Sequence, residues 1–284
     1  MNLLTDILFE LYELPNWQLA ACFIGFFLIF GLLGLTLFRG VIYSKMRLSS
    51  DTNEGVNFFA QTVGVLYGLL MGLVAVSCWD SFDHLDDLIS EEVSSIGSFS
   101  RMIAGLESVH RPEIQKKTVE YLEDILKVDW PRYAEGVKDY DASEPLFEVR
   151  SLLFKINPSP PNQQAIYQIV LKELEHMVQL RRLRINAFLD AGVPPIFWSV
   201  LFAGSLLSLV MTYFVHFPSL LAHASLISLY AIALGFMFFL IAALDNPYRG
   251  EVHVSTEPYE ALKKNLLEMR EAESRLMPTR HRPK

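Results

Sequence analysis

Four long apolar stretches constrain this chain more than any other feature of its sequence. Each has the length of a membrane span, and they cover about residues 19–38, 58–79, 193–215 and 220–244. About 20 apolar residues in a helix cross a bilayer core, because the helix satisfies every backbone polar group within the segment. We therefore predict an all-α membrane protein with four transmembrane helices.

The segment between the second and third spans, residues 80–192, is polar and predicted to form a helical extramembrane domain. Apolar residues recur at steps of three and four directly after the second span, at Leu85, Ile89, Ile96, Phe99, Ile103 and Leu106. This spacing is typical of an amphipathic helix, and no breaker separates it from the span. One long helix should therefore leave the membrane.

This pattern divides the chain into four segments. They are an N-terminal segment with the first transmembrane hairpin (1–79), a helical cytosolic domain (80–192), a second transmembrane hairpin (193–244), and a cytosolic tail with an amphipathic helix (245–284). In the tail, Ser255 or Thr256 can cap a helix whose apolar face includes Tyr259 and Leu266, and this helix should dock on the cytosolic domain.

Composition excludes several function classes. A net charge of −8 argues against a nucleic-acid partner, which normally requires a basic surface. The two cysteines, Cys22 and Cys78, fall inside apolar stretches, so neither a disulfide framework nor a metal site is predicted. No phosphate-binding glycine loop, zinc-protease motif or nucleophile elbow occurs, so we predict no catalytic residue and no cofactor. The lipid bilayer is the one partner that composition indicates.

Orientation follows from the lysines and arginines near the span ends. The loop between the first two spans carries Arg39, Lys45 and Arg47, whereas six lysines or arginines flank the spans on the opposite side. Basic residues are enriched in cytoplasmic loops. We therefore expect both termini and the 80–192 domain in the cytoplasm.

The second span carries a ridge of small residues. It consists of Ala60, Gly64, Gly68 and Gly72, with the polar Gln61 beside it. Such ridges let helices approach closely in lipid, where shape complementarity replaces the hydrophobic effect. The ridge therefore indicates close helix packing within one subunit, or alternatively a subunit interface or thin helix wall beside a conduction path.

Charged residues of opposite sign flank the predicted extramembrane domain. The acids share one helical face after the second span, at Asp80, Asp83, Asp87 and Glu91. The bases precede the third span, at Arg181, Arg182 and Arg184. At about 1.5 Å per residue the two groups reach similar heights, which favours interhelical ion pairs. The alternative is that an oligomer arranges the carboxylates as a ring at a pore exit that favours cations.

The fourth span ends in a turn formed by Asp245, Asn246, Pro247 and Tyr248. An acid within a membrane is a functional candidate, and an acid beside Asn-Pro is equally suited to cap a turn. Both interpretations of Asp245 stay open at this point.

Two stretches resemble the bestrophin-like family of bacterial and plant membrane proteins. One is GVLYGLLMG, from Gly64 to Gly72, which continues through Trp79 into the acidic helix, and the other is LDNPYRG, from Leu244 to Gly250. The order of two spans, a helical insert, two spans and a tail matches as well. The resemblance implies a bacterial inner-membrane location and a homo-oligomer, pentameric as in the more distantly similar bestrophins, with a permeant ion as ligand.

The turn after the last span departs from that of true bestrophins. The Asn-Pro-Tyr at 246–248 matches the start of their turn, but their calcium-binding acidic run is replaced by residues 249–253. Calcium gating is therefore not implied. We expect an oligomeric bestrophin-like ion channel whose pore is lined by the second span. The alternative is a non-conducting membrane scaffold or sensor whose helical domain binds a partner.

Overall fold

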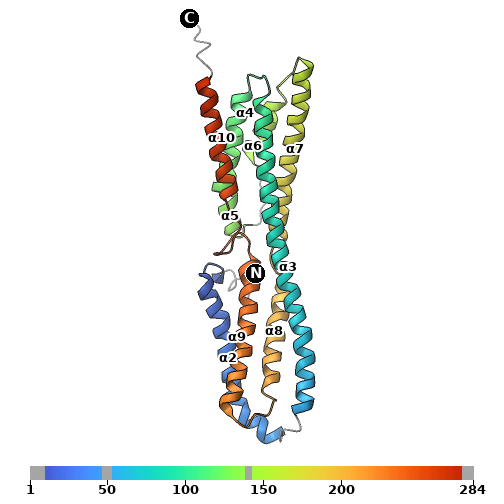
Figure 1. The fold of residues 1–284 in the computed structure, drawn as a ribbon, viewed down its shortest axis with the longest axis vertical. Coiled ribbons are helices and arrows are strands. Elements are labelled where there is room, and N and C mark those ends of the chain that lie inside the picture. Colours follow the sequence, from blue (N-terminus) through green and yellow to red (C-terminus); the bar gives the residue numbers. More distant parts are fainter. Residues whose placement is uncertain (1–9, 47–52, 138–142, 277–284) are drawn as a thin grey trace. The chain divides into compact units, whose positions relative to one another are not determined.

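A computed structural model describes residues 10–46, 53–137 and 143–276, which are almost entirely helical and contain no strand (Figure 1). Its helices are α2 (Asn16–Met46), α3 (Asn53–Ala104), α4 (Arg111–Asp124), η2 (Ile125–Asp129), α5 (Trp130–Ala134), α6 (Glu144–Leu153), α7 (Pro161–Asp190), α8 (Pro195–Thr212), α9 (Leu220–Asp245) and α10 (Glu257–Leu276). Four of these helical segments are long and apolar enough to cross a membrane. The predicted fold class is therefore confirmed. Arg47, one of the three basic loop residues, lies outside the described ranges.

The chain forms two compact units. The membrane unit comprises residues 1–82 and 191–253, and the extramembrane unit comprises residues 83–190 and 254–284. The prediction placed all of residues 245–284 in one tail, whereas the contacts divide this stretch after His253. Helix α10 thus belongs to the same unit as α4 to α7.

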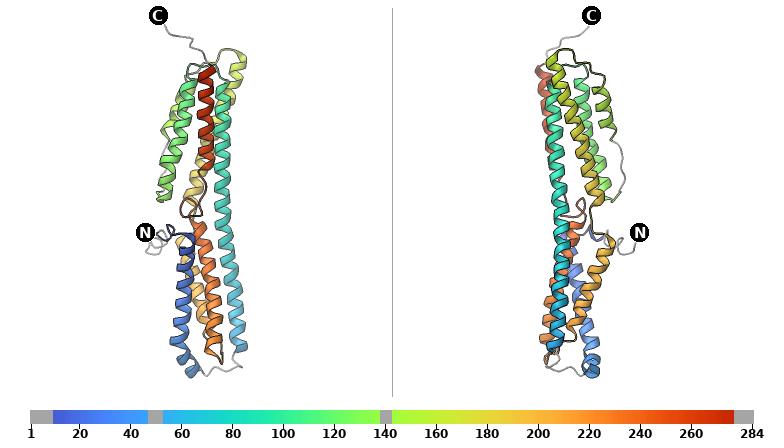
Figure 2. Two further views of the ribbon diagram at one scale, coloured as in Figure 1. Left: turned by 60° about the vertical axis from the view of Figure 1, so that its left-hand side comes forward. Right: turned by 90° about the vertical axis from the view of Figure 1, so that its right-hand side faces the viewer.

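In the membrane unit, α2 lies along α9, as both views of Figure 2 show. Gly235 of α9 makes this close approach possible, because a Cβ there would lie 2.6 Å from the Cα of Ile24. A cluster of stacked and tilted phenylalanines, including Phe27, Phe202 and Phe238, fills the space beside it. Helix α8 begins at Pro195, a residue whose fixed φ suits the first turn of a helix.

In the extramembrane unit, the apolar stripe of α3 is the core. The predicted stripe residues are all buried, with exposed fractions of 1% or less at Leu85, Ile89, Ile96, Phe99, Ile103 and Leu106. Helix α10 lies beside α4 and α3 (Figure 2), and Leu262 approaches Gly97 of α3. Tyr259 and Leu266 are buried, as docking of the tail helix requires.

A π-helical turn, η2, separates α4 from α5. Its wider turn inserts an extra residue into the helical repeat, so the faces before and after it are out of step. Ile125 and Asp129 at its two ends, and Trp130 after it, are buried. Asp129 follows the buried Leu122 and Ile125 of this stretch at steps of seven and four, so a carboxylate occupies a position on its buried stripe.

Candidate functional site

Helix α3 presents two different faces in the membrane unit. One face is buried and carries Tyr67, Met71, Val74 and Cys78. The tyrosine holds the helix in place, because its hydroxyl donates to the Leu201 carbonyl of α8. The opposite face is more than half exposed at Val65, Leu69, Leu73 and Val76. An apolar face of this length, within a membrane-spanning helix, is free to contact lipid or another subunit.

The three glycines of the α3 ridge have open space beside them among the residues that the structure describes. A Cβ built on Gly64, Gly68 or Gly72 would meet no atom within 4 Å. Ala60 is half-buried and Gln61 is exposed. By contrast, a Cβ on Gly204 of α8 would lie 2.4 Å from the Tyr67 ring. Among the described residues, the close packing of α3 against α8 thus uses Gly204 and not the ridge.

The four acids of α3, namely Asp80, Asp83, Asp87 and Glu91, are all exposed. Counted along the helix, they follow Leu69 and Val76 at steps of three, four and seven, so they continue the exposed face. The predicted ion pairs between these acids and the arginines are wrong. Arg181 and Arg184 pair with Asp129 and Glu92 instead, and Arg182 is exposed.

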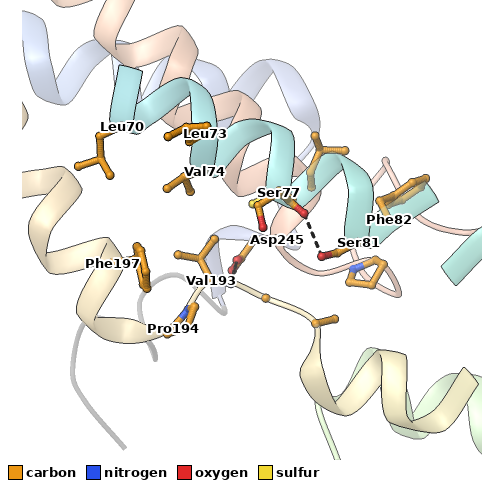
Figure 3. A pocket seen from close by; sticks show the side chains of 15 residues that line it. Leu70, Leu73, Val74, Ser77, Ser81, Phe82, Val193, Pro194, Phe197 and Asp245 are labelled. Atoms are coloured by element: carbon orange, nitrogen blue, oxygen red, sulfur yellow. Dashed lines mark hydrogen bonds between the residues drawn. The ribbon is translucent and has the colours of Figure 1, made fainter. Parts of the chain in front are cut away.

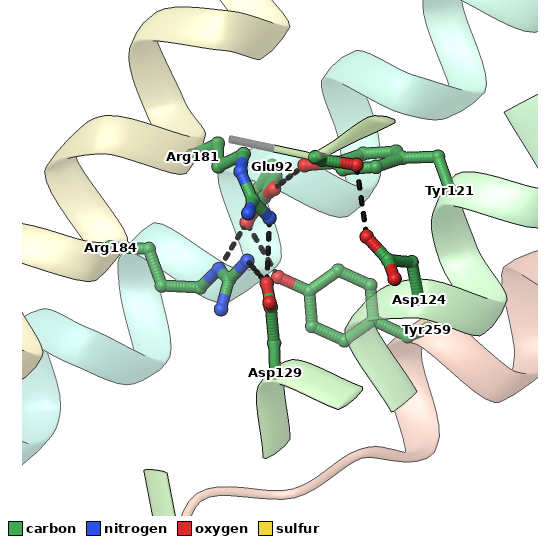
Figure 4. A network of polar contacts seen from close by, with 8 residues as sticks. Glu92, Tyr121, Asp124, Asp129, Arg181, Arg184 and Tyr259 are labelled. Atoms are coloured by element: carbon green, nitrogen blue, oxygen red, sulfur yellow. Dashed lines mark hydrogen bonds and ion pairs between the residues drawn. The ribbon is translucent and has the colours of Figure 1, made fainter. Parts of the chain in front are cut away.

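The actual partners form a buried polar network in the extramembrane unit (Figure 4). Glu92, which is 0% exposed, accepts three hydrogen bonds: from Arg184 Nε at 2.6 Å, from the Tyr121 hydroxyl at 2.5 Å and from the Tyr259 hydroxyl at 2.7 Å. Asp129 accepts from Arg181 at 2.6 Å and from Arg184 at 3.3 Å. The two arginines and two acids balance in charge.

The two phenols in this network keep their protons. Burial raises the pKa of Tyr121 and of Tyr259 well above 10, and the nearby Glu92 charge raises both further. Each hydroxyl is therefore a fixed donor to Glu92. Because these residues come from α3, α4, η2, α7 and α10, the network ties five helices of the extramembrane unit together.

The turn after α9 is a second polar hub, this time in the membrane unit (Figure 3). One carboxylate oxygen of Asp245 accepts from the backbone N–H of Val193, and the other accepts from the Tyr12 hydroxyl. Gly192, at φ +97°, lets the chain turn toward this carboxylate. These bonds favour the turn-capping interpretation of Asp245.

The other residues of the predicted turn are held by a hydrogen bond within the turn and by burial. Asn246 accepts from the Tyr248 N–H at 3.2 Å, which is the geometry of an Asx turn, and Tyr248 is buried. Arg249 pairs with Glu13 and so joins the turn to the segment before α2. Within the described residues, no cluster of three or more histidine, cysteine or acidic side chains could hold a metal ion.

A comparison with protein families matches residues 25–259 to the bestrophin-like domain. The chain belongs to the bestrophin-like family. A search of curated proteins finds no match. Among solved structures, a variant of a bacterial bestrophin homologue from Klebsiella pneumoniae is similar, with a TM-score of 0.66 at 11% identity, covering 87% of this chain and 99% of that one.

Two further structures agree with this likeness. Another crystal structure of the Klebsiella pneumoniae bestrophin homologue gives a TM-score of 0.62 at 14% identity, covering 87% of this chain and 98% of that one. A crystal structure described only as a membrane protein variant gives 0.63 at 14% identity, over 87% and 98% of the two chains. At such identities the likeness concerns the fold of this bestrophin-like protein, which is thus a multi-pass membrane protein.

Sequence reasoning missed Glu92 although a signal was present. Glu92 falls between Ile89 and Ile96 on the apolar stripe of α3, at steps of three and four. Arg181 and Arg184 likewise continue the buried stripe of α7, after Met177. A charged residue at a stripe position indicates burial with a partner. Asp129 carries the same signal, because it follows the buried Leu122 and Ile125 at steps of seven and four.

Proposed function

We propose that this bestrophin-like protein is an oligomeric ion channel of a bacterial inner membrane, with the exposed face of α3 lining the pore. The main observation in support is that no other described part of the chain covers this face, and that its side chains change from apolar to acidic along the helix. It is apolar at Leu69, Leu73 and Val76, and acidic from Asp80 to Glu91.

An apolar pore segment and a ring of carboxylates perform different tasks in a channel. A narrow apolar segment dewets and so limits conduction, whereas carboxylates at the pore exit raise the local concentration of cations. A homo-oligomer repeats both features around one axis. The acidic face therefore favours cations as the permeant ions.

The glycine ridge supports assembly. Small residues promote helix association in lipid because they allow close backbone contact, and the ridge at Gly64, Gly68 and Gly72 meets no other helix of the same membrane unit. We propose that it packs against a neighbouring subunit. The resemblance to bestrophins suggests five subunits, which the mass of the assembly, or a count of subunits in its images, would test.

The charge bias supports an orientation with both termini and the extramembrane unit in the cytoplasm. The extramembrane unit would then form a cytosolic vestibule. A fluorescent reporter that matures only in the cytoplasm, fused after Lys284, should fluoresce. A dark fusion, together with an active periplasmic reporter at the same position, would reverse the orientation.

Ion flux in proteoliposomes tests conduction and selectivity together. We expect the wild type to pass cations, and the variant Asp80→Asn/Asp83→Asn/Asp87→Asn/Glu91→Gln to lose at least half of its cation preference, read as a reversal-potential shift toward the anion. The matched control is Glu175→Gln, which neutralises an exposed acid of α7 and should leave selectivity unchanged. If all three proteins had the same selectivity, the acidic face of α3 would not line the ion path.

One observation favours the alternative of a scaffold or sensor. Phe147 of α6 and Phe154 directly after it are 67% and 68% exposed in the extramembrane unit, where lipid does not cover them. Exposed aromatic side chains of this kind mark partner surfaces. An oligomer that reconstitutes with the correct mass yet passes no ion under any voltage would favour this function over conduction.

A further inference from the structure

The membrane unit contains a pocket that borders the buried face of α3 and reaches Leu73 at the edge of its exposed face. The pocket has a volume of 340 Å³ and lies between α3, the turn at residues 191–194 and the first turn of α8 (Figure 3). This volume falls at the lower end of the range for ligand sites in proteins. The pocket is large enough for part of a ligand and not for a whole lipid.

The lining changes in polarity along the helix axis. Leu70, Val74 and Phe197 form the end deeper within the span, and the hydroxyl-bearing Ser77 and Ser81 line the end nearest the exit of the span, beside the ring of Phe82 (Figure 3). The pocket is thus apolar where the bilayer is apolar and polar where the headgroup region begins. A membrane lipid has the same polarity gradient.

Two observations show a built site at the polar end. The Cys78 side chain lines the pocket and is only 7% exposed. The carboxylate of Asp245 also lines the pocket and is fixed by hydrogen bonds from Val193 and Tyr12. Carboxylate oxygens that act as acceptors at this end suit a headgroup with an ammonium donor better than an anionic headgroup without one.

We propose that this pocket binds one acyl chain of a zwitterionic phospholipid, with the ammonium-bearing headgroup toward Ser77, Ser81 and Asp245. The bound chain fills the space between α3 and the first turn of α8. Phosphatidylethanolamine has the required chemistry, whereas a free fatty acid presents a carboxylate to Asp245. The inference does not depend on conduction, because lipid occupancy is measured without ion flux.

Photolabelling of the full-length protein in nanodiscs tests the site. Phosphatidylethanolamine with a diazirine on its acyl chain should label peptides that contain residues 70–82 and 193–197. Ser77→Phe, which fills the pocket, should reduce this labelling at least fivefold. The control Val76→Phe, at a position 57% exposed on the other face, should retain it. Equal labelling of both variants would mean that only bulk lipid contacts the helix, and would overturn the proposal.

Two further experiments identify the ligand and test the site without the bulky substitution, which could impair folding. A diazirine fatty acid should label the same peptides at least fivefold less than the phospholipid, and stronger labelling by the fatty acid would overturn the headgroup assignment. In a Cys22→Ser/Cys78→Ser background that carries the near-isosteric Ser77→Cys at an exposed position of the pocket, phosphatidylethanolamine should slow maleimide modification at least fivefold relative to delipidated protein. An unchanged rate would place the acyl chain outside the pocket.

Discussion

Different interactions stabilise the interior of each of the two units of this bestrophin-like protein. In the membrane unit, tyrosine hydroxyls donate to backbone carbonyls of other segments, as Tyr43 does to Val215 and Tyr213 to Phe30, both at 3.0 Å. Glycines let the rings and helices approach, and Tyr213 lies directly against Gly34. In the extramembrane unit, a dry network of two arginines and two acids crosses the helical interior.

The difference follows from the solvent around each unit. Helices in lipid gain little from burying apolar side chains, so close backbone contact and neutral hydrogen bonds decide how they pack. Helices in water gain from apolar burial without needing a specific register. A buried charge network tolerates one arrangement only, because any other leaves a charge unpaired. We therefore infer that the network specifies the register of the extramembrane helices.

Arg184→Ala should give the largest effect. The side chain is 0% exposed and bonds to both Glu92 and Asp129, so its loss leaves buried Glu92 without a cationic partner and Asp129 with Arg181 alone. We expect a loss of about 3–5 kcal/mol in the stability of the extramembrane unit. Thermal unfolding of the full-length protein in detergent, followed by circular dichroism, measures it.

The neighbouring Arg182→Ala is the matched control. Arg182 is exposed on the same helix, and its replacement should change stability by no more than about 0.5 kcal/mol. If both alanine variants unfolded at the same temperature, the buried network would not be what holds this unit.

The effect of a glycine-to-alanine substitution on the stability of the membrane unit should depend on whether the added Cβ meets another segment. Gly235→Ala places a Cβ against the Ile24 backbone, which a side-chain rotation cannot relieve, and should cost about 1–3 kcal/mol. Gly68→Ala meets no atom within 4 Å and should be neutral or stabilising by up to about 1 kcal/mol in the isolated subunit. Denaturation in detergent at subunit-dissociating concentrations separates these outcomes. A larger loss at Gly68 than at Gly235 would contradict the comparison.

A surface ion pair should give the smallest effect. Hydrogen bonds from Lys263 and Lys127 lower the pKa of Glu123 from 4.5 to about 2. Because the pKa of Glu123 is lower in the folded state, the ion pairs of its carboxylate stabilise the fold above about pH 4.5. This stabilisation is lost as the pH falls toward 2. The glutamate is solvated, so Glu123→Gln should cost less than about 1 kcal/mol at neutral pH.

The dependence of this stability difference on pH and salt shows whether it arises from charge. The difference between Glu123→Gln and the wild type should shrink as the pH falls through this window, and also in about 1 M salt, which screens exposed charges. A difference that stayed constant with pH and salt would arise from packing and not from charge.

The sequence alone determined the membrane spans and the apolar stripes. Span length follows from the thickness of the bilayer core, and stripe positions follow from the helical repeat, so both are local properties. Leu85 and Ile89 could be placed inside on that ground, and α3 could be predicted as one continuous helix. The same repeat put Asp80, Asp83 and Asp87 on an exposed face.

Only the tertiary structure decided the partners. Stripe positions indicate that Glu92 and Asp129 are buried, but which arginine each carboxylate meets depends on how α7 packs against α3 and η2. Asp245 meets Tyr12 across 233 positions of sequence. Such contacts between distant segments are set by how helices pack, which no local repeat encodes.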